Sequence, residues 1–400
     1  METLKEQRST MTVDRFPTEI INEIISRLPV KSILRFRSVS KPWLSRISDP
    51  SLIKLQLTHA TASHRAALFL SAYDKRTRKR FFLSAAPDGG PATLLMTIDD
   101  SRDTDITTEH LNGFVCLACE KSLYDYNDNI HAFVVNPSTR QMFTIPDPTD
   151  CSGYGHLGYF FGFDESRNEH KILLIRYVLR SSKVEFMIYS LSNHSWRKID
   201  VERPVGFSWG RLSCHLDGGV CVNSVVHIML LDLSYDILAL DLKTEKLSII
   251  SIPQDVLSRE PSRTSCCRSC EIFLKDNKLY IMKINGCLGV VCHDRVAESS
   301  EIDIWILQDY DNRVWVRETV KFPESWSESG GPFPLPVDVN MDEIIFSASK
   351  VSGNVIRLPV YNMKTRCFKS LHFTLGDQFL CSETVKFNHT KCYVESIMPL

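Results

Sequence analysis

The sequence has no long hydrophobic run. Its first residues, METLKEQRSTMTV, are polar and lack the apolar stretch of a secretory signal peptide. The most apolar segment, residues 225–240, is interrupted by a histidine and two aspartates, so no part of the 400 residues reaches the length of a membrane span. The 13 cysteines are an odd number in a chain without a secretory signal. We therefore expect reduced thiols, no membrane partner, and a location in the cytoplasm, the nucleus or both.

An excess of charge of either sign is also absent. Lys plus Arg total 47 and Asp plus Glu total 48, so the net charge is −1 at pH 7. A near-neutral chain is not typical of a dedicated nucleic-acid binder, and we expect no nucleic-acid partner. The densest basic run, Lys75 to Arg80, lies between two apolar stretches. It is predicted to be the solvated tip of a hairpin rather than a nuclear-localisation or nucleic-acid patch.

Catalytic signatures are missing as well. The sequence has no Gly-rich phosphate loop, no HExxH helix and no GxSxG elbow. The pairs Cys116/Cys119 and Cys267/Cys270 have a spacing that can hold zinc, but they lie far apart in the chain. The first pair also lies in an apolar strand, whose alternation would place the two sulfurs on opposite faces. We predict no catalytic residue, no metal and no cofactor.

What the sequence does contain is a helical pattern between residues 14 and 48. Pro17 falls in a first helical turn, where its missing N–H costs little. The apolar residues that follow recur with the 3.6-residue period of a helix: Ile20, Ile21, Ile24, Ile25 and Leu28. A second short helix follows Pro29, and a third begins at Ser40. A unit this small rarely stabilises itself alone, so its remaining apolar face suggests a docking surface.

This segment resembles the F-box, the module that joins a substrate receptor to the Skp-type adaptor of cullin–RING ubiquitin ligases. The alternative is an ordinary helical hairpin packed on its own domain. The resemblance implies that the adaptor, and through it cullin and RING subunits, are partners of this chain. It also implies that nine residues contact the adaptor: Phe16, Pro17, Ile20, Ile24, Leu28, Pro29, Leu34, Val39 and Trp43.

The charge of the first 60 residues supports docking. They carry 10 Lys and Arg against 6 Asp and Glu, a net of +4, whereas the other 340 residues carry 37 against 42, a net of −5. The adaptor family bound by F-boxes is acidic, so this sign would speed encounter and orient the complex more than it adds affinity. A solvated basic face is a compatible interpretation. The basic residues cluster around the second helix: Arg27, Lys31, Arg35, Arg37, Lys41 and Arg46.

The rest of the chain has a repeating β pattern. Five segments share a strand, a polar turn and a second strand, and they align on Asn136, Ser190, Asp241, Gln308 and Asn362. Turn pairs mark further hairpins, at Asn112-Gly113, Asn223-Ser224, Asp276-Asn277 and Met341-Asp342. About four short strands in roughly 50 residues is the spacing of a kelch-type propeller blade. We predict a mainly β chain in which the small helical F-box precedes a kelch-like propeller of about six blades, each a four-stranded antiparallel sheet. The alternative is an irregular pair of β-sandwiches.

This region resembles the plant F-box-associated domains of the type 1/type 3 group. The matching segments, in order, include LNGFVCL, NPSTRQ, FGFDESRNEHKILLI, VCVNSVVHIM and the terminal YVESIMPL. With the F-box, the resemblance covers nearly the whole chain and implies three parts: a disordered N-terminus over 1–11, an F-box over 12–60 and a substrate-recognition domain over 66–400.

The two resemblances together imply a non-catalytic substrate-recognition subunit of an SCF (Skp–cullin–F-box) ubiquitin ligase. Its β domain would bind a target protein, whose identity and binding residues the sequence does not reveal. Two alternatives remain open. One is an F-box scaffold that acts outside degradation, and the other is an enzyme built on a kelch-like propeller, which would need clustered metal ligands at the propeller axis.

Overall fold

A computed structural model of the chain describes residues 17–62, 66–99, 106–119, 132–148, 154–178, 183–213, 216–230, 236–256, 279–292, 300–323, 335–347, 351–352, 354–376, 379 and 385–400. Several predicted features lie outside these residues, namely the N-terminal 1–11, Phe16, the Cys267/Cys270 pair and the Asp276-Asn277 turn. Within them, no helix is long and apolar enough to cross a membrane.

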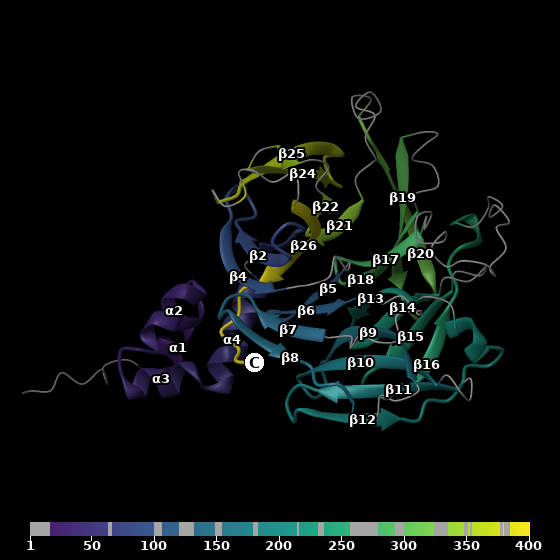
Figure 1. The fold of residues 1–400 in the computed structure, drawn as a ribbon, viewed down its shortest axis with the longest axis horizontal. Helices are drawn as coiled ribbons and strands as arrows, with labels where there is room; N and C mark the ends of the chain where they lie inside the picture. Colours follow the sequence, from purple (N-terminus) through teal and green to yellow (C-terminus); the bar gives the residue numbers. More distant parts are fainter. Residues whose placement is uncertain are drawn as a thin grey trace, which may run out of the picture.

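Four helices form a separate unit beside the β structure (Figure 1). They are α1 (Thr18–Ser26), α2 (Val30–Phe36), α3 (Lys41–Ile47) and α4 (Pro50–Ala62). Pro17 and Pro29 stand at the N-caps of α1 and α2, where no N–H is needed. Ser40 caps α3, because its hydroxyl oxygen accepts the backbone N–H of Trp43 at 3.5 Å. We call residues 17–62 the helical unit.

The remaining strands form six sheets, which are the blades of a β-propeller (Figure 1). Each blade has four main antiparallel strands, so the predicted mainly β fold of six blades after a small helical module is confirmed. From the innermost strand outward, the first blade is β26 (Val385–Val394), β1 (Ala66–Asp74), β2 (Lys79–Ala85) and β4 (Thr93–Asp99), and the second is β5 (Ile106–Leu111), β6 (Phe114–Cys119), β7 (Ala132–Asn136) and β8 (Gln141–Thr144). The third blade is β9 (Tyr154–Asp164), β10 (Glu169–Val178), β11 (Lys183–Ser190) and β12 (Ser195–Ile199), and the fourth is β13 (Leu216–Val222), β14 (Val225–Leu230), β15 (Ile237–Asp241) and β16 (Leu247–Ile250). The fifth blade is β17 (Leu279–Ile284), β18 (Cys287–Cys292), β19 (Glu301–Asp309) and β20 (Val314–Lys321), and the sixth is β21 (Pro336–Asn340), β22 (Glu343–Phe346), β24 (Val355–Asn362) and β25 (Cys367–Thr374).

Four short elements complete the fold. Strand β3 (Gly90–Pro91) pairs in parallel with β25, and β23 (Val351–Ser352) pairs with β24. Two short 3-10 helices, η1 (Trp209–Ser213) and η2 (Gln254–Val256), lie in connections.

The last strand of the chain closes the ring. Strand β26 pairs along its length with β1, so the first blade contains both ends of the propeller sequence. This pairing joins the end of the propeller sequence to its beginning and covers the edge of β1 that would otherwise be open. It also brings the final residues of the chain back to the helical unit, where residue 62 ends α4.

One type of hairpin turn, closed by an Asp or Asn side chain, recurs around the ring. In six hairpins an Asp or Asn side chain accepts the backbone N–H two residues ahead, at Asp74, Asn136, Asp164, Asp241, Asp309 and Asn362. In each, the residue four positions ahead has a positive φ. The predicted alignment on Gln308 is therefore wrong by one residue, because it is Asp309 that makes this turn, with Arg313 at positive φ.

Three hairpin turns can be compared with the turn pairs predicted from the sequence. Asn223 and Ser224 both have positive φ, 51° and 65°, which is the type I′ geometry that suits a two-residue hairpin. Asn112 and Gly113 have the same geometry, as predicted. In the fifth blade the β17–β18 turn is Asn285-Gly286, which was not among the predicted turns, and the predicted Asp276-Asn277 turn lies outside the described residues.

The basic run at the β1–β2 turn is only partly solvated. Residues 75–79 are exposed, as predicted for a hairpin tip. Arg80 is instead fully buried, with its guanidinium 5.2 Å from the centre of the Tyr73 ring. The prediction is wrong for Arg80 because Arg80 already lies on β2 and faces the core side of that strand.

A buried ion pair lies within the third blade, and its lysine also bonds to the fourth blade. The Lys171 ammonium donates to Asp164 Oδ2 at 2.6 Å and to the Leu242 carbonyl at 3.2 Å, and both charged side chains are almost fully buried. Burial alone would raise the pKa of Asp164, but hydrogen bonds from Lys171 and Ser166 outweigh it and hold the pKa at about 2. Asp164 therefore stabilises the fold above about pH 4, and this contribution is lost as the pH falls toward 2.

Replacing Lys171 by Met should destabilise the propeller by about 3 kcal/mol, because the Asp164 carboxylate is left buried without its counter-charge. Chemical denaturation at pH 7 measures the effect. Lys198→Met is the matched control, since that lysine pairs with Glu185 at the surface and its loss should cost less than about 1 kcal/mol. Equal stabilities of the two variants would contradict the prediction.

Candidate functional site

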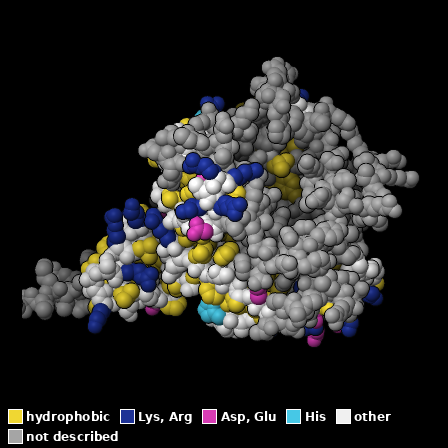
Figure 2. All heavy atoms as spheres, viewed as in Figure 1, with side chains coloured by type: hydrophobic (Ala, Val, Ile, Leu, Met, Phe, Trp, Pro, Cys, Tyr) yellow, Lys and Arg dark blue, Asp and Glu magenta, His cyan; other side chains and the backbone are white. Residues whose placement is uncertain are grey.

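The helical unit presents exposed apolar side chains in two places. Ile20 and Ile24, one helical turn apart on α1, are 48% and 58% exposed, and Val39 and Leu44, at the corner between α2 and α3, are 64% and 43% exposed. Large apolar residues that the folded chain leaves this exposed are candidates for a protein interface. Figure 2 shows hydrophobic and basic side chains side by side on this unit. We call Ile20, Ile24, Val39 and Leu44 the exposed apolar positions.

The predicted adaptor-contacting residues divide into two groups. Pro17, Ile20, Ile24, Pro29 and Val39 are exposed and available to a partner. Leu28, Leu34 and Trp43 are half-buried and pack against the interior of the helical unit, with Trp43 stacked on Phe36 at 5.3 Å between ring centres. Phe16 lies outside the described residues. The structure thus brings eight of the nine into one small unit, where three of them also support the fold.

The apolar stripe of α1 explains this division. Its isoleucines lie on two adjacent flanks of the helix rather than on one face. Ile25 is buried and Ile21 half-buried against α4, whereas Ile20 and Ile24 face solvent. Leu44 was not identified from the sequence as a contact residue, because the α3 pattern gives no sign of which apolar residues α4 covers.

Polar contacts fix the helices to one another. Glu23 on α1 accepts from Arg27 Nε at 2.8 Å, and its second carboxylate oxygen lies 3.1 Å from His59 Nε2 on α4. The hydrogen bonds from Arg27 and His59 lower the pKa of Glu23. Arg46 on α3 reaches Asn22 Oδ1 at 3.4 Å. Helix α1 is therefore tied to α4, and α3 is tied to α1.

Several basic side chains of the helical unit form no ion pair with a described carboxylate. Lys31, Arg35 and Lys41 are exposed and form no ion pair with any residue that the structure describes. They lie close to the exposed apolar positions in sequence, on α2 and α3. A partner with an acidic surface would be attracted and oriented by them.

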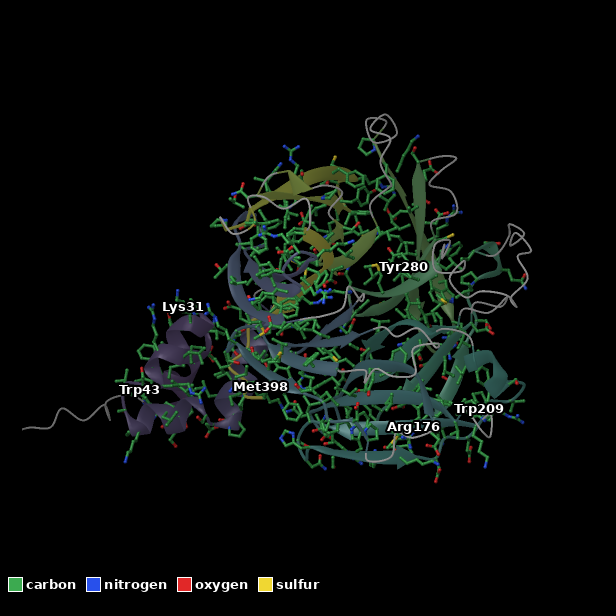
Figure 3. The ribbon with its side chains drawn as sticks, in the orientation of Figure 1. Lys31, Trp43, Arg176, Trp209, Tyr280 and Met398 are labelled. Carbon is green, nitrogen blue, oxygen red and sulfur yellow. The ribbon has the colours of Figure 1, made fainter. Side chains whose placement is uncertain are left out.

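The opposite side of the helical unit is closed by the end of the chain. Residues 395–400, which we call the C-terminal tail, run between α4 and the second blade, and Figure 3 places Met398 there, away from Trp43 and Lys31. Ile397 is 2% exposed and belongs to the same core as Ile33 and Leu52. The core of the helical unit is thus completed by a residue from the far end of the sequence.

Two buried amides hold the tail on both sides. The Gln56 amide of α4 donates to the Glu395 carbonyl at 3.0 Å and accepts the Ile397 N–H at 3.3 Å. From the propeller, the Asn136 amide donates to the carbonyls of Ser396 at 3.1 Å and Met398 at 2.7 Å. The tail is therefore a joint that connects the helical unit to the second blade.

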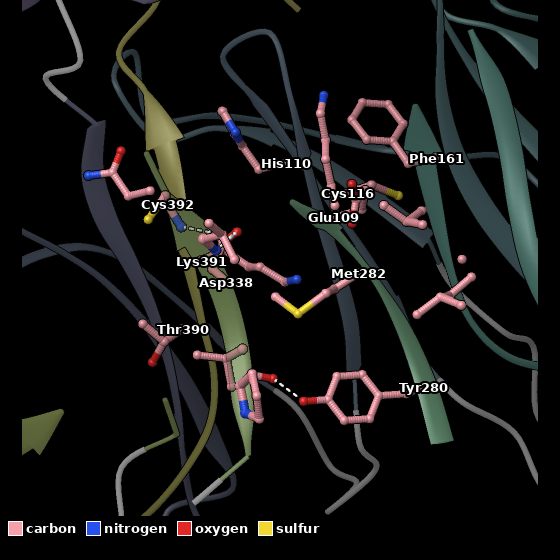
Figure 4. A pocket seen from close by; sticks show the side chains of 18 of the residues that line it. Glu109, His110, Cys116, Phe161, Tyr280, Met282, Asp338, Thr390, Lys391 and Cys392 are labelled. Atoms are coloured by element: carbon pink, nitrogen blue, oxygen red, sulfur yellow. Dashed lines mark hydrogen bonds between the residues drawn. The ribbon is translucent and has the colours of Figure 1, made fainter. Parts of the chain in front are cut away.

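A second candidate site lies at the centre of the ring. An axial cavity of about 910 Å³ is lined by the innermost strands of all six blades, β5, β9, β13, β17, β21 and β26 (Figure 4). Charged residues from several strands face it, including Glu109, Lys283, Asp338 and Lys391. Among the described residues, no three His, Cys, Asp or Glu side chains lie close enough together to hold a metal ion.

Comparisons with protein families agree with these two parts. A family model described as "F-box associated beta propeller domain" matches residues 65–393, and one described as "F-box domain" matches residues 13–55. These matches do not test the kelch likeness of the blades, which stays a prediction.

Similar proteins occur in Arabidopsis thaliana. The F-box protein At1g30790 is 25% identical over 370 residues, which cover 86% of this chain and 85% of that protein. The F-box protein At5g65850 is 25% identical over 334 residues, covering 80% and 74%. Among solved structures, the β-propeller domain of the Trilobed protease from Pyrococcus furiosus is similar over 67% of this chain and 70% of that one, with 10% identity and a TM-score of 0.34. A likeness this weak supports no functional conclusion.

Proposed function

The chain belongs to the family of F-box proteins with an F-box associated β-propeller, and on this premise we propose that it is a substrate-recognition subunit of an SCF ubiquitin ligase. The helical unit docks a Skp-type adaptor, and through it cullin and RING subunits, while the propeller binds a target protein. The chain itself supplies no chemistry. Ubiquitin is transferred to a lysine of the target by the assembled ligase, in the cytoplasm or the nucleus.

One observation carries this proposal, the contrast between the two sides of the helical unit. Its inner side is sealed by Ile397 and the Gln56 hydrogen bonds, whereas its outer side leaves four large apolar residues in solvent. A module that packed only on its own chain would have no reason to leave Ile24 and Val39 more than half exposed. The basic residues beside them favour an acidic partner.

The rate advantage of such a receptor comes from proximity. Holding adaptor and target on one chain replaces a dilute encounter by an effective concentration set by the geometry of the complex. The joint formed by the C-terminal tail supports this role, because a fixed connection between the helical unit and the propeller keeps the target at one distance from the ligase.

Assembly from purified components tests the proposal. The full chain should co-elute in size-exclusion chromatography with a Skp-type adaptor and then with cullin and RING subunits added in turn. A complex that takes up the adaptor but excludes cullin would instead favour a scaffold that acts outside degradation. Failure to bind any adaptor would overturn the proposal.

A further inference from the structure

The axial cavity has the size and the mixed lining of a small-molecule site. Its volume of about 910 Å³ lies in the range of roughly 300–1,000 Å³ that holds drug-sized ligands. One part of the wall is aromatic and apolar, with Tyr159, Phe160 and Phe161 from β9 and Met282 from β17. Such a wall offers contact to a carbon skeleton, which an inorganic ion would not use.

Several polar groups in the wall are already occupied by the fold. Asp338 on β21 accepts the N–H groups of Cys392 at 2.5 Å and of Val339 at 2.8 Å. His110 Nε2 accepts the N–H groups of Gly113 and Val394, and the Tyr280 hydroxyl donates to the Pro336 carbonyl at 2.8 Å. These contacts fasten neighbouring blades together and leave little capacity for a ligand.

Two cations in the wall are not occupied in this way. Lys283 on β17 and Lys391 on β26 form no ion pair or hydrogen bond with another side chain in the described part of the chain. In Figure 4 the side chain of Lys391 extends from its strand into the space toward Met282. The two lysines come from different blades, line the same cavity and both act electrostatically on Glu109 and His110. An anion placed between them would gain two charge-assisted hydrogen bonds.

Glu109 on β5 makes the charge of the cavity depend on pH. Its surroundings raise its pKa to about 7, with burial as the main cause and Asp338 adding to it, against the opposing effects of Lys391 and Lys283. One histidine and two thiols near Glu109 are neutral near pH 7. His110 has a pKa of about 3, and burial raises the pKa of the Cys116 and Cys221 thiols to about 12 and about 11. Asp338 and the two lysines complete the set that faces Glu109.

We propose that the axial cavity is a binding site for a small organic carboxylate, held by Lys283 and Lys391 and packed against Phe160 and Met282. The Glu109 carboxyl donates a hydrogen bond to this anion when protonated and repels it when ionised. Because the protonated form favours binding, the affinity for the anion falls as the pH rises through about 7.

Isothermal titration calorimetry on the full chain tests the site, with citrate as the probe and phosphate and chloride at equal ionic strength as comparators. Citrate should bind more tightly than phosphate, and its affinity for the wild type, relative to a Glu109→Gln variant at the same pH, should fall by about tenfold from pH 6 to pH 8. Lys391→Met should weaken citrate binding by at least about tenfold. Lys283→Met, on another blade, should do the same and guards against a folding defect specific to β26. Lys321→Met, an exposed lysine on the outer strand β20, should leave binding unchanged.

Glu109→Gln separates the pH effect from the charge of the lysines. The ionisation of citrate between pH 6 and pH 8 affects this variant and the wild type alike, so the variant should bind citrate about as tightly as the wild type at pH 6 and about tenfold more tightly at pH 8. Equal binding by wild type and Lys391→Met, phosphate binding as tight as citrate binding, or no heat with millimolar citrate would each overturn the site. The site does not depend on the ligase role, because adaptor binding by the helical unit is measured separately on the same variants.

Discussion

Replacing both Ile24 and Val39 by aspartate should abolish binding of a Skp-type adaptor while leaving the melting temperature of the chain unchanged. Both side chains are more than half exposed and contribute little to the core of the helical unit. In the proposed complex they become buried, so the variant loses two apolar contacts and places two carboxylates in an interface without partners.

The expected loss is large. Burial of an isoleucine or a valine side chain contributes about 1.5–3 kcal/mol, and an unpaired charge at an interface costs several kcal/mol more. A total of about 5 kcal/mol corresponds to an affinity loss of more than about 1,000-fold, which surface plasmon resonance registers as complete loss of binding.

Two matched variants control for the added charge. Met142→Asp on β8 and Val316→Asp on β20 place the same carboxylate at apolar residues that are 42% and 40% exposed on the propeller. Both should bind the adaptor as the wild type does. Leu28 is a poorer position for this test, because it packs inside the helical unit and its loss would disturb the fold as well. Adaptor binding that survives the Ile24/Val39 double change would contradict the docking role.

The helices and the number of blades follow from local patterns in the sequence. Prolines at 17 and 29 and the serine at 40 mark helix starts, and the structure has α1, α2 and α3 at these points. The blades follow from a repeated turn, in which an Asp or Asn side chain closes the hairpin. Such signals depend on a few adjacent residues and do not need the tertiary structure to be known.

Two errors in the blade pattern have local causes. The predicted alignment on Gln308 is one residue too early, because β19 carries a bulge between Leu307 and Asp309 and the turn begins at Asp309. The predicted turns do not include Asn285-Gly286, although Asn-Gly between two apolar stretches is a strong hairpin signal.

The contacts between distant parts of the chain could not be predicted in this way. The pairing of β26 with β1, the place of Ile397 in the helical core and the convergence of Lys283 and Lys391 on one cavity each join residues from distant parts of the sequence. No period or motif specifies them, because they depend on how the blades close into a ring. The burial of the α1 isoleucines could not be predicted either. The helical period shows which residues lie on the apolar stripe, but it does not show which of them α4 covers.

The joint between the two parts of the molecule makes a second large effect expected. Replacing Ile397 by Asp should detach the C-terminal tail from α4 and destabilise the helical unit by more than about 5 kcal/mol. Loss of a buried isoleucine side chain costs about 2–5 kcal/mol, and the new carboxylate would lie among Ile33, Leu52 and Ile53 without a partner.

Differential scanning calorimetry with hydrogen exchange distinguishes this effect from general unfolding. The propeller should keep its own transition, because its blades are closed by β26, which ends before the tail at Val394. Amides of α1 and α4 should exchange faster, and adaptor binding should fall because the exposed positions are no longer held in place. Pro399→Asp adds the same charge at an exposed position two residues further on and should change neither property. If Ile397→Asp left the exchange of α4 unchanged, the tail would not stabilise the helical unit, and the proposed fixed distance between ligase and target would need another structural origin.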